Sequence, residues 1–115
     1  MLDTLQIMLY NNRGIKVMVL FDYLKLFSVY KGLLTEKQAE VFSLYAECDL
    51  SLGEIAEIKG VSRQSVSDTI SKTKEILLSY ENKLSLCKIK SEVYEIATSV
   101  DNEDLKSKLL NLLGE

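Results

Sequence analysis

Apolar residues recur at helical spacing along most of the chain and predict an all-α fold. Leu20, Leu24, Phe27 and Tyr30 follow one another at intervals of three or four residues, as on one face of a helix. The run 15–20 just before them is rich in β-branched residues and is the one place where a strand could be argued. Its helical continuation favours a helix there too. Because proline is absent, we expect long helices with short connections.

Three helix starts follow one another closely in the middle of the chain. Residues 35–38 (Thr-Glu-Lys-Gln) and 51–54 (Ser-Leu-Gly-Glu) both match the capping box, in which the first and fourth residues cap each other. Ser62 is the expected N-cap of a third helix. The first of these helices is expected to bury one face, made by Ala39, Phe42 and Tyr45 or Ala46. The third is expected to continue to about residue 82 on one apolar stripe that includes Val66, Ile70 and Leu77.

Residues 51–70 have the pattern of a helix-turn-helix. Gly60 lies where the chain must turn sharply, since glycine accepts a positive φ at little cost. Val61 is expected to fill the angle between the two helices, and Val66 and Ile70 to be buried. We therefore predict one helical domain over 1–115, with a helix-turn-helix core at 35–82. In this motif the second helix normally lies in a DNA major groove.

Two positions depart from the usual pattern of this motif. The residue before Gly60 is usually a buried aliphatic, and here it is Lys59, preceded by Ile58. Either the apolar contact has moved to Ile58, or Lys59 buries its stem and extends its ammonium outward. Thr69 also stands where a buried aliphatic is common, and Ile70 is expected to take over that role.

Polar residues of the second helix form the candidate nucleic-acid-binding surface. Arg63 suits a guanine and Gln64 an adenine, while Ser62 and Lys72 suit phosphates. Asp68 on the same helix would repel a phosphate unless it meets a cytosine amino group. The alternative interpretation is a solvated polar helix that contacts a protein. The full candidate set is Ser62, Arg63, Gln64, Ser65, Ser67, Ser71, Lys72 and Lys74.

The charge of the chain limits how it can bind nucleic acid. The net charge is −3, yet residues 62–90 hold six basic and three acidic residues, which gives this segment a net charge of +3. An acidic chain argues against dense phosphate contact, while a locally basic segment fits a selective nucleic-acid contact or an acidic protein. DNA, RNA or a ribonucleoprotein, and protein alone therefore stay open as partners.

Catalytic and metal chemistry have little support in the sequence. The chain has no histidine, no Gly-rich phosphate loop and two distant cysteines, Cys48 and Cys87, which we expect to be free thiols. We expect no enzyme activity, no cofactor, no metal and no small-molecule substrate. The apolar run 15–21 is too short to cross a bilayer and no signal peptide is recognisable, so we predict a cytoplasmic protein without membrane contact.

The two ends of the chain extend beyond the motif. Residues 1–17 are an N-terminal extension whose order the sequence does not decide. Residues 87–113 are expected to form two helices, separated by a break and cap at Asp101 and Asn102. Their apolar stripes exceed what a three-helix motif needs, so they must cover the core or meet a second subunit. We predict a homodimer on this ground. The stripes are Ile89, Val93, Ile96, Ala97 and Val100, then Leu105, Leu109, Leu112 and Leu113.

The segments 33–38, 51–56, 61–68 and 80–84 together resemble the YlxM family. These are small bacterial proteins with a helix-turn-helix similar to region 4 of sigma factors. The resemblance covers about residues 18–86 and, more loosely, the C-terminal helices. It implies an all-helical cytoplasmic protein that regulates the signal recognition particle pathway, a role inferred from gene neighbourhood. The two hypotheses are a DNA-binding regulator and an accessory factor that binds the particle's RNA or protein. Ser65 and Ser67 stand where the family usually has Ala and Tyr, so this chain lacks a stacking group at position 67.

Overall fold

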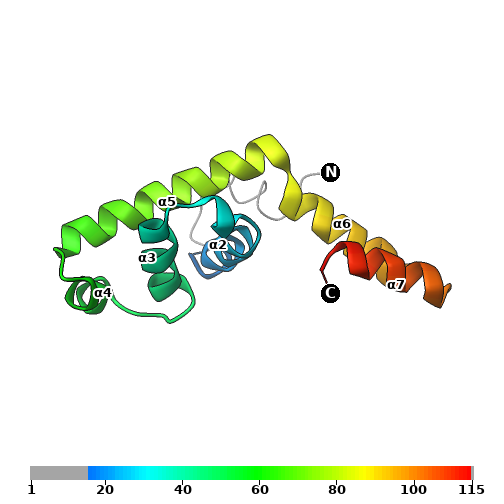
Figure 1. Cartoon of the computed structure of the whole chain (residues 1–115), viewed down its shortest axis with the longest axis horizontal. Coiled ribbons are helices and arrows are strands. Elements are labelled where there is room, and N and C mark those ends of the chain that lie inside the picture. Colours follow the sequence, from blue (N-terminus) through cyan, green and yellow to red (C-terminus); the bar gives the residue numbers. More distant parts are fainter. Residues whose placement is uncertain (1–15, 115) are drawn as a thin grey trace.

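The computed structural model describes the backbone of residues 16–114 and the side chains of residues 23–114. These residues form six α-helices and one short 3-10 helix, without a strand among them (Figure 1). The all-α prediction is confirmed, including the helix that begins at Lys16. Most of the predicted extension, residues 1–15, lies outside the described residues. The elements are α2 (Lys16–Tyr30), η1 (Lys31–Leu33), α3 (Glu36–Ala46), α4 (Leu52–Lys59), α5 (Arg63–Leu84), α6 (Leu86–Ser99) and α7 (Glu103–Leu112).

The long helix α5 organises the core. It runs along one side of the molecule, and α2, α3 and α4 all pack against it (Figure 1). The Phe27 and Phe42 rings, from α2 and α3, meet with centroids 5.2 Å apart. Burial of this one apolar cluster holds the four helices together. Its members are Leu26, Phe27, Tyr30, Val41, Phe42, Ile55, Ala56, Val66, Ile70 and Leu77.

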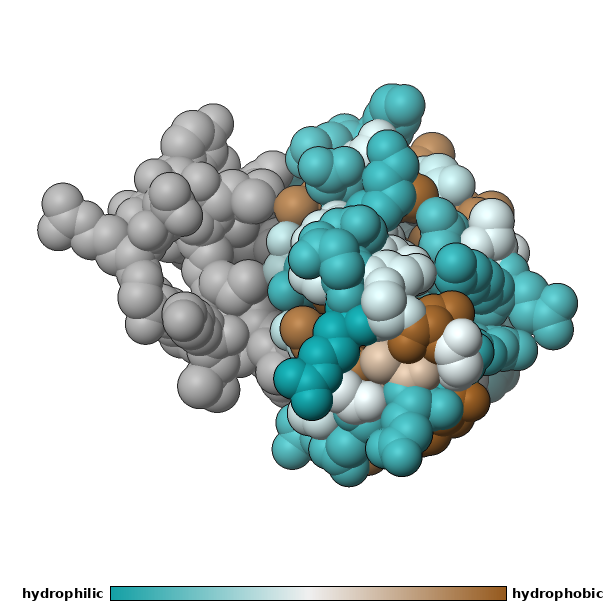
Figure 2. Space-filling model, turned by 90° about the vertical axis from the view of Figure 1, so that its left-hand side faces the viewer, coloured by the Kyte–Doolittle hydropathy of each residue, from teal (hydrophilic) through white to brown (hydrophobic). Residues whose placement is uncertain are grey.

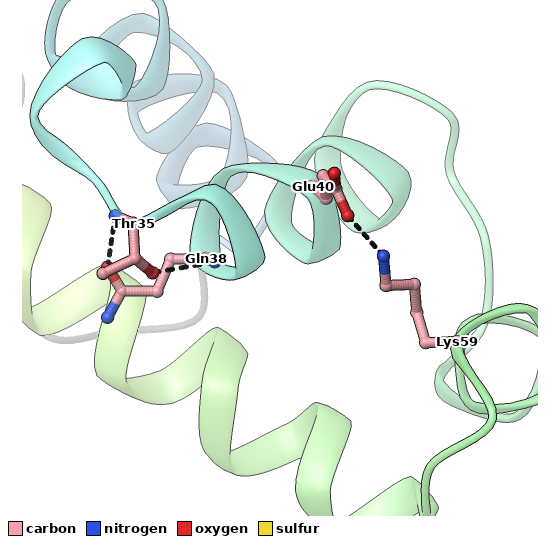
Figure 3. Close-up of polar contacts among 4 residues, drawn as sticks. All are labelled: Thr35, Gln38, Glu40 and Lys59. Carbon is pink, nitrogen blue, oxygen red and sulfur yellow. Dashed lines mark hydrogen bonds and ion pairs between the residues drawn. The ribbon is translucent and has the colours of Figure 1, made fainter.

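The predicted helix starts are confirmed. Thr35 and Gln38 form a reciprocal capping box at the start of α3 (Figure 3), and Ser51 and Glu54 form the second at α4. The two hydrogen bonds from the backbone and side chain of Ser51 lower the pKa of the Glu54 carboxyl. The Ser62 hydroxyl accepts a hydrogen bond from the Ser65 backbone N–H and so caps α5. Each cap satisfies backbone donors that the first turn of a helix leaves free.

The turn between α4 and α5 confirms one expectation and corrects another. Gly60 adopts the left-handed conformation with φ of 67°, as its place at the turn predicts. The prediction that Val61 fills the angle between the helices is wrong, because Val61 is 38% exposed. Ile55, Ala56 and Val66 are buried between the two helices instead, and they belong to the shared core.

The departure at Lys59 has a structural explanation. Ile58 is 61% exposed, so the missing apolar contact has not moved to it. Lys59 is partly buried and its ammonium pairs with the Glu40 carboxylate on α3 (Figure 3). An ion pair between α3 and α4 thus stands where an aliphatic contact is common. Ile70 is buried as predicted, while the half-buried Thr69 hydroxyl donates to the Ser65 carbonyl.

The C-terminal arm, which we define as α6 and α7, leaves the core at a sharp bend. Ser85 has φ of 54°, so the chain changes direction directly after α5. Helix α7 folds back along α6, and the pair projects away from α2–α5 (Figure 1). The predicted break is confirmed, since the Asn102 side chain caps α7 by accepting from the Leu105 N–H. The arm contributes to the extents of 53 × 29 × 23 Å.

A buried carboxylate fixes the bend. Glu81, near the end of α5, accepts hydrogen bonds from the backbone N–H groups of Cys87 and Lys88 at 3.1 and 3.2 Å. The Tyr30 hydroxyl donates to Glu81 at 2.6 Å and accepts from the Leu86 N–H at 3.0 Å. Negative charge at a helix N-terminus is stabilising, and three otherwise free donors of α6 are satisfied here. Glu81 and Tyr30 therefore orient the arm relative to α2 and α5.

Candidate nucleic-acid interface

The candidate surface begins at the exposed N-terminus of α5. Ser62 and Arg63 are both exposed, and the first turn of α5 carries no acidic residue. The free N–H groups of a first turn and the helix dipole both favour an anion such as a phosphate. Ser62 uses its oxygen as an acceptor for the cap, which leaves its hydroxyl hydrogen free to donate outward.

Arg63 lies across the start of α4. A Cβ placed on Gly53 would come within 3.0 Å of the Arg63 Nε and Nη2 atoms. The absence of a side chain at position 53 therefore gives the guanidinium room to lie against α4. This contact joins the two helices of the motif and holds a cation at their exposed end.

An exposed stripe continues along α5 from Gln64. The Gln64 amide donates to the Asp68 carboxylate at 2.9 Å, one turn away. Lys72 and Glu75 form a long ion pair of 3.9 Å, with both side chains largely in solvent. An exposed pair of this kind contributes little stability, so Lys72 stays available to a ligand. The stripe, which we call the outer face of α5, consists of Gln64, Asp68, Ser71, Lys72 and Glu75.

Three of the sequence candidates lie away from the outer face. Ser65 and Ser67 are only partly exposed. The Lys74 ammonium is 5.1 Å from the ring centroid of Tyr23 and 5.2 Å from that of Tyr45, and it donates to the Tyr45 hydroxyl. Lys74 thus points toward α2 and α3, where cation–π contacts hold it. The structure brings together Ser62, Arg63, Gln64, Ser71 and Lys72 on the exposed side.

Exposed apolar residues flank this end of the motif. Leu52 and Ile58 on α4 and Val61 in the turn all keep a large exposed fraction. Figure 2 views the end of the molecule where α4 and the beginning of α5 lie, and shows hydrophobic surface set among hydrophilic residues. The surface beside Arg63 is therefore mixed rather than uniformly basic.

Sequence reasoning missed the polar contacts between distant segments. Tyr30 and Glu81 are 51 residues apart, and Glu40 and Lys59 are 19 apart. One signal for Glu81 was present, because it follows Leu77 at the spacing of the buried stripe. Among the described residues, no group of three or more His, Cys, Asp or Glu side chains could hold a metal ion. Within the same part of the chain, no helix combines the length and apolar character needed to cross a membrane.

Comparison with known proteins places the chain in a family. A family model described as "Putative helix-turn-helix protein, YlxM / p13 like" matches residues 19–113. A UPF0122 protein of Halalkalibacterium halodurans is 46% identical over 76% of this chain and 84% of its own length. UPF0122 proteins of Clostridium acetobutylicum and Ureaplasma urealyticum are 43% and 38% identical, each over 76% of this chain and over 68% and 88% of their own lengths. The predicted resemblance is confirmed, and the chain belongs to the UPF0122 family of YlxM/p13-like helix-turn-helix proteins.

Proposed function

We propose that this protein is a non-enzymatic regulator that acts in the cytoplasm and contacts duplex DNA through the beginning of α5. The observation that carries the proposal is the exposed α5 N-terminus, with Ser62, Arg63 and Gln64 presented together and no carboxylate in the first turn. Ser62 and Lys72 would contact phosphates, and Arg63 and Gln64 would reach base edges. Ser71 would lie beside Lys72 along the same groove. Ser65, Ser67 and Lys74 are left out of this contact.

The proposed contact is electrostatically weak. Asp68 and Glu75 share the outer face with Lys72, so few cations are available to neutralise phosphates. Each neutralised phosphate makes the slope of log affinity against log salt more negative by about 0.9. With about two or three contacts, the slope would be about −2 to −3. The affinity for DNA would then depend more on base contacts by Arg63 and Gln64 than on electrostatic attraction to the phosphate backbone of DNA.

A second candidate is an accessory factor of the signal recognition particle that binds its RNA or protein. Two observations favour it over DNA: the outer face holds two carboxylates against one lysine, and the apolar side chains of Leu52, Ile58 and Val61 are exposed. Such a mixed surface also suits a ribonucleoprotein or protein partner. The link to this particle comes from the family resemblance alone.

One set of variants distinguishes these candidates. Arg63→Ala and Lys72→Glu are assayed in parallel against duplexes selected from a random pool, particle RNA and particle protein. Lys37→Glu is the matched control, since it makes the same charge change at an exposed site on α3. For DNA recognition we expect enrichment of a duplex site, with at least tenfold weaker binding by both test variants and unchanged binding by Lys37→Glu.

Three other outcomes would contradict DNA recognition by α5. If no duplex is enriched and none is retained at low salt, DNA recognition is wrong. If particle RNA or protein binds and the two α5 variants weaken that binding, the accessory-factor role replaces it. If Lys37→Glu weakens binding as much as Lys72→Glu, the contact is a general charge effect and α5 is not the interface.

A further inference from the structure

The arm carries an apolar stripe with coiled-coil spacing, whose centre is left about half exposed by the residues that the structure describes. Its side chains follow one another at alternating intervals of three and four residues, the pattern that brings apolar residues to one seam of a helix. Ile89 is 50% exposed and Ile96 is 55% exposed, so the centre of this seam faces solvent. We call it the α6 seam; it consists of Leu86, Ile89, Val93 and Ile96 on α6, with Val100 directly after the helix.

The seam is held away from the core. Apart from Cys87, no residue of the arm belongs to the described core cluster or to the partly buried residues packed against it. Ser85 turns the chain outward, and Glu81 with Tyr30 fixes the start of α6. The two sequence-based alternatives for these stripes were covering the core or meeting a second subunit. Since the α6 seam does not cover the core, a second subunit is the alternative that fits the structure.

We propose that the α6 seam binds the same seam of a second copy of this chain, with the two helices antiparallel. The charges at the two ends of α6 favour this partner and this direction. Lys88 and Lys90 lie near the start of α6, and Asp101 and Glu103 lie just beyond its end. Antiparallel pairing brings the basic end of one copy beside the acidic end of the other, in both halves of a two-fold interface. Parallel pairing would place like charges side by side.

The small size of the seam favours a weak, reversible association. Helix α6 has 14 residues and is therefore about 21 Å long, which is two heptads. An interface of this length lies at the small end of specific protein contacts. We therefore expect a reversible dimer with a dissociation constant on the order of 10–100 μM. The proposal does not depend on nucleic-acid binding, so either can fail without the other.

Sedimentation of the full-length protein between about 1 and 500 μM, a range spanning that constant, tests this surface. The wild type should shift from monomer to dimer with concentration, and Ile89→Lys with Ile96→Lys should remain monomeric. Ile58→Lys is the matched control, because Ile58 is at least as exposed but lies on α4; it should dimerise like the wild type. Each of these isoleucines is at least half exposed, so circular dichroism should show the same helix content in each protein.

Charge reversal tests the direction of pairing. Lys88→Glu with Lys90→Glu should weaken the dimer at least tenfold, and adding Asp101→Lys with Glu103→Lys should restore it. A protein that is monomeric up to 500 μM contradicts the proposal, as does a dimer that survives the seam substitutions. Loss of the dimer in Ile58→Lys would place the interface on the helix-turn-helix instead. Failure of the second pair to restore the dimer would overturn the antiparallel arrangement.

Discussion

The Tyr30 hydroxyl links three helices at the bend between the core and the arm. It donates to the Glu81 carboxylate of α5 and accepts from the Leu86 N–H of α6, while its ring belongs to the core. Burial, together with the hydrogen bond to Glu81, raises the pKa of the Tyr30 phenol to about 12. The neutral hydroxyl is therefore the form that the folded protein favours.

Replacing Tyr30 by Phe should lower the free energy of unfolding by about 1–3 kcal/mol at pH 7, since Glu81 then loses a buried donor. The wild-type contribution is fully present below pH 10, the ordinary pKa of tyrosine, and is lost as the pH rises through about 12. Urea unfolding at pH 7, 10, 11 and 12 should show that the difference in free energy of unfolding between the two proteins decreases as the pH rises. A difference in free energy of unfolding that stays constant with pH would contradict this role of the hydroxyl.

At the scale of single residues, the sequence predicted the local capping bonds but not the contacts between distant segments. The side chains that cap their own helices, Thr35, Ser51 and Ser62, were predictable because each bond spans three residues. The hydrogen bond between Tyr30 and Glu81 and the cation–π contacts of Lys74 with its two tyrosines join distant segments. Local spacing carries no information on such partners. Lys74 was therefore assigned to the nucleic-acid-binding set although its ammonium lies among aromatic rings.

At the scale of elements, the α4–turn–α5 unit depends on one backbone conformation. The Gly60 N–H bonds back to the Ala56 carbonyl and ends α4, and Gly60 has φ of 67°. Only the backbone geometry requires glycine, because a Cβ at this position would meet nothing within 4 Å. The turn was predictable because glycine accepts a positive φ at little cost and is therefore typical of such a turn. The exposure of Val61 was not, since it depends on how α4 and α5 pack.

Gly60→Ala should destabilise the protein by about 1–2 kcal/mol, the cost of a left-handed conformation for a residue with a Cβ. Gly32→Ala is the matched control, because Gly32 has no positive φ and equal free space. It should be neutral or stabilising by up to about 1 kcal/mol. Urea unfolding of both variants measures the difference. Equal losses would show that the α4–α5 turn does not require the left-handed conformation.

At the scale of the whole molecule, two candidate binding surfaces lie far apart along its length. The candidate nucleic-acid interface lies at the α4 end of the elongated chain, and the α6 seam lies on the arm beyond the other end of α5 (Figure 1). The stripes of both regions were visible in the sequence. Their separation was not, because it is set by the bend at Ser85 and by the capping of α6 by Glu81. A dimer formed through the arms would leave both α5 N-termini free for a partner.

The most direct test of the central claim maps the bound surface by amide chemical-shift changes on adding the tightest-binding nucleic acid from the selection. The largest changes should fall on residues 62–72, with smaller changes at Gly53 beside Arg63. Arg63→Ala should abolish the changes at matched concentration, and Lys37→Glu should leave them in place. Changes confined to α3 or to the C-terminal arm, or no changes along α5, would contradict nucleic-acid binding through the beginning of α5.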